Sequence, residues 1–173
     1  MRRRTAVLAT AAGAALAAGV GSALWRRQAV SEEETHSDDV WNQTFETLAG
    51  GALPMTQFRG LPLLLNFWAT WCAPCVAEMP LLDSFAREAA GRFQVLALAV
   101  DRQEPVRRFL TEHRLSLSVA FATTIGLDLS RSLGNRLGAL PFTAVFATNG
   151  RLAAVRLGPL QPAVLKDWLE AVK

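Results

Sequence analysis

Cysteine and histidine are scarce in this chain, and their scarcity excludes several classes of protein. Two cysteines among 173 residues rule out a disulfide-rich scaffold and a zinc site built from four cysteines. The two histidines, His36 and His113, are far apart and show no ligand spacing, so we expect no metal site. With 51% hydrophobic and 19% charged residues, the chain has a globular composition.

A surplus of positive charge is absent from most of the chain, although the net charge is +3. Five of the 18 Lys and Arg residues lie in residues 1–27, which contain no acidic residue. The rest of the chain therefore carries 13 basic and 15 acidic side chains. Because nucleic-acid binding requires clustered cations to neutralise phosphates, we expect no nucleic acid among the partners.

Charged residues are also absent from residues 5–24, directly after three consecutive arginines. Twenty residues form a helix of about 30 Å, the thickness of the hydrocarbon core of a membrane. We therefore expect residues 1–27 to be a single N-terminal anchor in the bacterial inner membrane, with its start in the cytoplasm. The alternatives are a cleaved signal peptide, because the segment is rich in small residues, and a buried core helix.

An acidic segment separates this predicted anchor from the body of the chain. Residues 28–39 contain five acidic side chains and almost nothing apolar, which is typical of a flexible, solvated tether. We expect the tether to place a folded domain, residues 40–173, in the oxidising periplasm. With a cleaved signal peptide, the same domain is expected to be soluble in the periplasm.

Residues 40–173 alternate between strand and helix patterns. Continuous apolar runs predict buried strands, and Asn149-Gly150 between two such runs predicts a hairpin. The predicted strands are Leu61–Ala69, Phe93–Val100, Leu115–Phe121, Phe142–Ala147 and Leu152–Leu157, with edge strands in Val40–Leu48 and Leu53–Phe58. The predicted helices are Ala73–Ala90, Glu104–His113, Leu127–Leu133 and Pro162–Val172. This order predicts an α/β fold with a central mixed sheet flanked by helices and an antiparallel hairpin at one edge.

The two cysteines follow a predicted buried strand and open a predicted helix. Cys72 and Cys75 are three residues apart, so their sulfurs can close a short ring. Unpaired N–H groups and the dipole at a helix N-terminus stabilise a thiolate, which makes Cys72 the predicted attacking sulfur. Cys75 would then resolve the mixed disulfide, and Pro74 suits the first turn of the helix. The pair is therefore predicted to be a redox-active disulfide.

The cysteine pair has four other interpretations. Two unrelated buried cysteines would require a coincidence of spacing, strand context and compartment. A zinc site lacks two ligands, and a haem attachment site requires a histidine where Val76 stands. A purely structural disulfide is a poor explanation, because a bridge between residues i and i+3 closes too short a loop to stabilise much.

The stretch Leu65–Cys75 (LNFWATWCAPC), with Glu78-Met79-Pro80 after it, resembles the thioredoxin superfamily. It is most similar to the TlpA/ResA-like family of membrane-anchored thiol–disulfide oxidoreductases, and the likeness covers about residues 40–173. The resemblance implies a thioredoxin fold with N-terminal edge strands. It also implies a central strand-and-helix insertion over Glu104–Leu133, and no cofactor.

A second stretch, Gly138–Phe146 (GALPFTAVF), is similar to the family segment that holds a cis-proline. The resemblance implies that the peptide bond before Pro141 is cis and faces the cysteines. The backbone of Leu140 would then pair with a client strand, and Trp71 would shape client access. The alternative is an ordinary proline at the start of a strand.

Glu78 lies three residues after Cys75 and therefore points to a similar side of the helix. The resemblance implies that its carboxylate exchanges a proton with Cys75, whereas spacing alone favours a solvated helix charge. Asn66 stands where many thioredoxins carry a buried Asp, so proton transfer through such an Asp is not expected.

The resemblance implies a dithiol reductant of protein disulfides outside the cytoplasm, kept reduced by a membrane electron donor of the thiol-reducing type. Its expected clients are disulfides of the kind formed during assembly of cytochrome c or of copper sites. The alternative from another class is a metallochaperone that holds Cu(I) between Cys72 and Cys75, since thiolates suit that ion. A peroxidase is a weaker alternative, because the residues before Cys72 lack the Pro and Thr pattern that binds peroxide.

Overall fold

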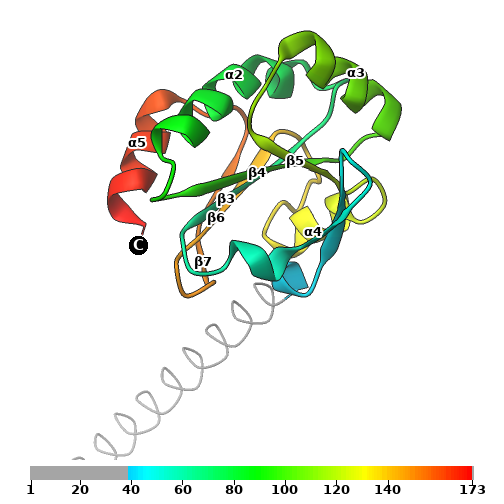
Figure 1. Ribbon diagram of the computed structural model, residues 1–173. Coiled ribbons are helices and arrows are strands. Elements are labelled where there is room, and N and C mark those ends of the chain that lie inside the picture. The colour runs from blue at the N-terminus through cyan, green and yellow to red at the C-terminus, as the bar shows by residue number, and fades with distance from the viewer. Residues whose placement is uncertain (1–38, 173) are drawn as a thin grey trace, which may run out of the picture. The chain divides into compact units, whose positions relative to one another are not determined.

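The computed structural model describes residues 39–172, which form one seven-stranded mixed sheet with helices on both faces (Figure 1). The strand order is β2-β1-β5-β4-β3-β6-β7. The strands are β1 (Thr44–Thr47), β2 (Ala52–Pro54), β3 (Leu63–Trp68), β4 (Gln94–Ala99), β5 (Ser118–Phe121), β6 (Phe142–Phe146) and β7 (Leu152–Leu157). This is the α/β thioredoxin fold that the sequence predicts.

The centre of the sheet consists of the strands with the most continuous apolar runs. All six residues of β3 are buried, and β3 pairs in parallel with β4 and antiparallel with β6. Strand β4 pairs in parallel with β5 in turn. The predicted hairpin is present, because β6 and β7 pair antiparallel on either side of a turn in which Gly150 has a φ of 82°. Glycine suits this turn because it adopts a positive φ without steric cost.

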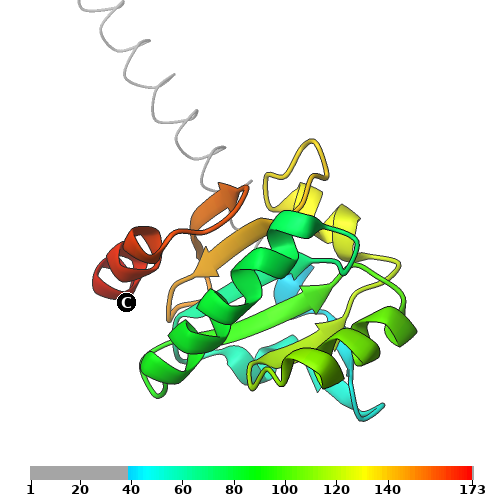
Figure 2. The ribbon, with the colours of Figure 1, turned by 90° about the horizontal axis from the view of Figure 1, so that it is seen from above.

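The helices are α2 (Ala73–Glu88), α3 (Gln103–His113), α4 (Gly126–Ser132) and α5 (Pro162–Ala171). On one face of the sheet, α2 lies between α5 and α3 (Figure 2). There Met79, Leu82 and Phe85 of α2 pack with Val106 of α3 and Leu165 of α5. The opposite face is covered by α4 and by the segments that contain Val40–Trp41 and Met55–Phe58. Side chains alternate between the two faces along β3, so this strand contributes to both apolar clusters.

The N-terminal edge differs from its prediction in one part. The strand predicted within Val40–Leu48 is present as β1. The strand predicted over Leu53–Phe58 is present only as far as Pro54, where β2 ends, and the prediction is wrong for Met55–Phe58. Residues Met55–Phe58 form a short 3-10 helix, η1, which buries Met55 and Phe58 against the sheet. The helical turn places two apolar residues three apart on one side, whereas a strand would bury alternate residues.

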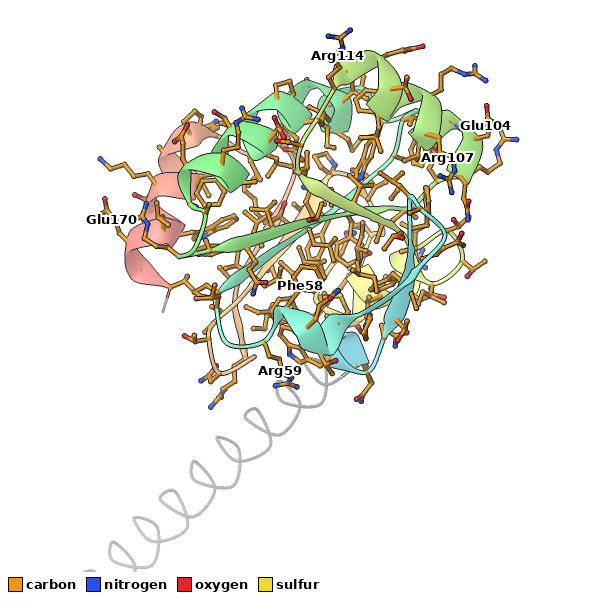
Figure 3. The ribbon with its side chains drawn as sticks, viewed as in Figure 1. Phe58, Arg59, Glu104, Arg107, Arg114 and Glu170 are labelled. Carbon is orange, nitrogen blue, oxygen red and sulfur yellow. A yellow bond between two sulfur atoms is a disulfide. The ribbon has the colours of Figure 1, made fainter. Side chains whose placement is uncertain are left out.

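The predicted central insertion is also present. Strand β5 pairs with both β4 and β1, and α4 follows it. The preceding helix is linked to the N-terminal hairpin as well. Arg107 projects from α3 toward the β1–β2 turn (Figure 3), where its guanidinium donates a hydrogen bond to the carbonyl of Leu48 and lies 5.3 Å from the ring centre of Phe121.

A buried carboxylate, Asp83, holds α2 to the start of β5. Its Oδ1 accepts hydrogen bonds from the N–H and hydroxyl of Ser116 at 2.7 and 2.8 Å, and from the N–H of Leu117 at 2.9 Å. Its Oδ2 accepts from Arg87. Burial favours a raised pKa for Asp83, but the hydrogen bonds from Ser116, Arg87 and Leu117 outweigh it and hold the pKa below its usual value.

We expect Asp83→Ala to lower the free energy of unfolding by about 3 kcal/mol at pH 7, because two backbone N–H groups lose their acceptor. A carboxyl whose pKa is lowered in the folded state stabilises the protein above its unfolded pKa, and this stability is lost as the pH falls. The difference between wild type and variant should therefore shrink in acid. Urea unfolding at pH 7 and pH 3 measures it. Asp128→Ala, which removes an exposed ion pair with Arg131, is the control and should cost less than about 1 kcal/mol.

The predictions for residues 1–38 lie outside the described residues. Within residues 39–172, the helices are too short or too polar to cross a bilayer.

Candidate active site

The cysteines lie at the junction of β3 and α2, as the sequence predicts. Cys72 and Cys75 are joined by a disulfide, with their Cα atoms 5.3 Å apart. Cys72 is the N-cap residue of α2, and its sulfur accepts a hydrogen bond from the N–H of Cys75 at 3.3 Å. The same N–H group would stabilise a Cys72 thiolate after reduction, because it belongs to the unpaired donors of the first helical turn.

The surroundings of the two sulfurs differ. Cys72 keeps 6% of its surface exposed and Cys75 none. Trp71, next to Cys72, is 68% exposed, and Ala73 and Pro74 are exposed as well. The exposed surface next to the disulfide is therefore on the side of Cys72 and Trp71, whereas Cys75 faces the interior.

Glu78 is buried, so the interpretation of this residue as a solvated helix charge is wrong. Only 4% of it is exposed. Its Oε1 accepts a hydrogen bond from the side-chain amide of Asn66 at 2.9 Å, and its Oε2 accepts from the N–H of Leu160 at 2.8 Å. Burial raises the pKa of Glu78, although both hydrogen bonds and the charge of Arg156 oppose the rise. The side chain is thus a buried acid one helical turn after Cys75.

Asn66 connects this acid to the strand that follows Pro141. Its Nδ2 also donates to Thr143 Oγ1 at 3.0 Å, and its Oδ1 is buried without a hydrogen-bond partner among the described residues. The amide therefore bridges α2 and β6 from within β3. Sequence reasoning identified Asn66 only by its departure from Asp, and its two partners come from distant parts of the chain.

Sequence reasoning missed Asp101, which fixes the loop before Cys72. Asp101 is 8% exposed and lies two residues after the end of β4. Its Oδ2 accepts hydrogen bonds from the N–H and the hydroxyl of Thr70, and its Oδ1 accepts from the N–H of Arg102. An acidic residue at the end of a buried parallel strand was the available signal, because such strand ends meet at one edge of the sheet.

The Leu140–Pro141 peptide bond is cis, as the resemblance implies. The carbonyl of Pro141 accepts a hydrogen bond from the N–H of Gly158 at 2.9 Å, which holds the segment to the end of β7. Phe142 pairs with Phe67, near the end of β3 that leads to Cys72. Leu140 is half-buried against the apolar cluster that contains both cysteines. The structure thus brings this segment to the cysteine end of the sheet.

A cluster of three or more metal-binding side chains is not found within residues 39–172. The reactive group that the structure shows here is the Cys72–Cys75 disulfide. A thioredoxin fold with a disulfide at the N-terminus of α2 and a cis-proline segment beside it defines a thiol–disulfide oxidoreductase.

Comparison with known proteins agrees and gives the family. The family model described as Redoxin matches residues 38–169, so the chain belongs to the Redoxin family. Within it, the chain is TlpA/ResA-like. It is 29% identical to the thiol-disulfide oxidoreductase ResA of Halalkalibacterium halodurans over 135 residues, which cover 76% of this chain and 74% of that protein. The enzyme is therefore a thiol–disulfide oxidoreductase of ResA type.

Two solved structures support the fold. The exposed lipoprotein thioredoxin Etrx1 of Streptococcus pneumoniae has a TM-score of 0.65 and 21% identity, over 75% of this chain and 98% of that one. A secreted disulfide oxidoreductase of Mycobacterium tuberculosis, homologous to DsbE of E. coli, has a TM-score of 0.65 and 18% identity, over 78% and 99%. At these identities the likeness concerns the fold alone.

Proposed function

We propose that this protein is an extracytoplasmic dithiol reductant of protein disulfides. The observation that carries the proposal is the disulfide at the start of α2, with Cys72 slightly exposed, Cys75 fully buried and a buried acid one turn further on. The residues between the cysteines support the direction of transfer. Ala73 and Pro74 add no cation that would stabilise the Cys72 thiolate strongly, as a strongly oxidising dithiol requires.

The reaction begins with the reduced protein. The Cys72 thiolate attacks one sulfur of a client disulfide, which breaks and leaves a mixed disulfide and one client thiolate. Cys75 then gives its proton to the Glu78 carboxylate and attacks the Cys72 sulfur, so the second client thiolate leaves. The client disulfide has gained two electrons, and the cysteine pair has lost them. Glu78 finally returns the proton to solvent or to a departing thiolate.

The client is proposed to bind beside the cis-proline. The backbone of Leu140 would pair with an extended client segment, Pro141 would hold that backbone in place, and Trp71 would cover the client disulfide. This arrangement places the client sulfur next to Cys72, the more accessible of the two sulfurs.

The proposed location is the periplasmic side of the bacterial inner membrane. Residues 1–27 would anchor the protein, and residues 28–39 would link the anchor to the catalytic domain. The charge-free run of residues 5–24 after three arginines supports this location. A cleaved signal peptide would give a soluble periplasmic protein. A membrane thiol donor would reduce Cys72–Cys75 again, and the clients would be disulfides formed during cytochrome c or copper-site assembly.

Reduction of a protein disulfide by the full-length protein in detergent tests the proposal. The reduced protein should reduce insulin. Its equilibrium with glutathione measures the reduction potential of the Cys72–Cys75 pair, which should be more negative than about −180 mV. A value more oxidising than about −180 mV would contradict the reductant direction. Tight Cu(I) binding without insulin reduction would instead support the metallochaperone.

A further inference from the structure

Asn135 is buried in the connection between α4 and β6, with 2% of its surface exposed. Its side chain folds over the next residues of the connection. The Nδ2 group donates to the carbonyl of Ala139 at 2.9 Å and to Ser130 Oγ at 3.1 Å. Its Oδ1 accepts from the N–H of Ala139 at 3.2 Å. One amide therefore satisfies both backbone groups of the residue that precedes Leu140.

The backbone of Asn135 fixes the same connection. Its N–H donates to the carbonyl of Ser130 at 3.0 Å, and its carbonyl accepts from the N–H of Gly138 at 2.8 Å. The residue is thus bonded to α4 on one side and to the segment before Pro141 on the other. Asn135 is the one residue among residues 39–172 that hydrogen-bonds to the backbone of Ala139, which is exposed.

Leu140 differs from Ala139 in this respect. Across residues 39–172, neither the N–H nor the carbonyl of Leu140 forms a hydrogen bond. A donor and an acceptor thus stand unpaired on a half-buried residue at the cysteine end of the sheet. Because part of Leu140 remains exposed, these two groups are free to pair with an extended segment of another chain.

We propose that Asn135 is a positioning residue for client binding: by occupying both polar groups of Ala139, it holds the Leu140 backbone ready and restricts client pairing to that residue. The inference rests on the proposed function, in which Leu140 pairs with the client. A preformed segment binds more tightly because its ordering cost is paid on folding and not on binding. Asn135 does not touch the sulfurs, so its effect is on client affinity and not on the chemistry of the dithiol.

Asn135→Ala in the full-length protein tests the inference. We expect the KM for a protein disulfide to rise about tenfold, because the paired backbone of Ala139 is released. The kcat for that client, the rate with a small-molecule disulfide such as oxidised glutathione, and the equilibrium constant with glutathione should all stay within about twofold, since none of these requires the ordered segment.

Two variants of α4 are matched controls. Ser130→Ala removes one partner of Asn135 but leaves both contacts with Ala139, so its KM should stay near that of the wild type. Ser132→Ala removes a comparable hydrogen bond, to the carbonyl of Leu129, that does not involve the connection. Thermal unfolding shows whether each variant is folded.

An unchanged KM in folded Asn135→Ala would overturn the inference, and so would an equal loss of rate with protein and small-molecule disulfides. If Asn135→Ala does not fold, the KM is measured for Asn135→Asp. This variant keeps the acceptor for the Ala139 N–H but turns a carboxylate oxygen toward the Ala139 carbonyl, so an unchanged KM would again overturn the inference. Loss of folding in both would make Asn135 a folding determinant and overturn the positioning role. A wild-type protein that reduces no disulfide would instead overturn the proposed function.

Discussion

Cys72→Ser is expected to lower the rate of disulfide reduction by a factor on the order of 10³ or more, because the remaining thiol, Cys75, is fully buried and out of reach of a client disulfide. A serine hydroxyl is not ionised at neutral pH, and the N–H groups at the start of α2 do not change that. The fold should remain intact, since the change replaces one sulfur by oxygen at the edge of the core. Insulin reduction measures the rate, and circular dichroism checks the fold.

The matched variant Cys75→Ser should behave differently. Cys72 can still attack a client, but the mixed disulfide is not resolved, so the protein should accumulate covalently bound to its clients. Mass spectrometry of the trapped adducts then identifies them. Recovery of the same adducts with Cys72→Ser would contradict the assignment of the attacking sulfur, as would an equal yield from the two variants.

Glu78→Gln is expected to slow the resolving step about 100-fold at neutral pH, since the glutamine cannot take the proton of Cys75. The mixed disulfide should then persist even though both cysteines are present. In the wild type, the rate should depend on the ionisation of a carboxyl whose pKa lies above its ordinary value of 4.5, and this dependence should be missing in the variant. Stopped-flow measurement of resolution against pH shows both effects.

Glu88→Gln, which changes an exposed position of the same helix, is the control. Identical pH profiles for wild type and Glu78→Gln would refute the proton-exchange role.

The same burial has a consequence for stability. A carboxyl whose pKa is raised in the folded state favours folding below its unfolded pKa, and this contribution is lost as the pH rises through the folded pKa. Glu78→Gln removes that dependence. The free energy of unfolding of the variant minus that of the wild type should therefore be larger at pH 7 than at pH 4. Urea unfolding of both proteins at the two pH values measures this difference. A difference of the opposite sign would indicate that Glu78 is stabilised as an anion.

The elements that the sequence predicts best are those with a local signal. The continuous apolar run of β3, the Asn149-Gly150 turn and the cysteine pair each specify their structure within a few residues, and all three are confirmed. The Leu53–Phe58 prediction failed for a related reason. Its apolar residues at positions 55 and 58 fit a short helix as well as a strand, and Pro54 lacks the N–H that would continue the ladder.

The parts of the site that the sequence did not predict depend on distant partners. The burial of Glu78 requires Leu160, 82 residues away, to supply an N–H group, and Asn66 to supply an amide. Asp101 reaches Thr70 across 31 residues. Helical spacing predicts the direction of the Glu78 side chain, but it does not predict which distant residues cover that side chain. The resemblance to a family suggested a role for Glu78 where spacing alone favoured solvent.

The position of β5 between β4 and β1 links two segments that the chain order keeps apart. The N-terminal hairpin reaches the sheet only through β5, because β1 pairs with β2 and β5 and with no other strand of residues 39–172. A homologue that lost the inserted strand would leave the hairpin without a neighbour and its edge open to intermolecular pairing. The β1–β2 hairpin and the insertion that contains β5 are therefore expected to be present together or absent together in homologues.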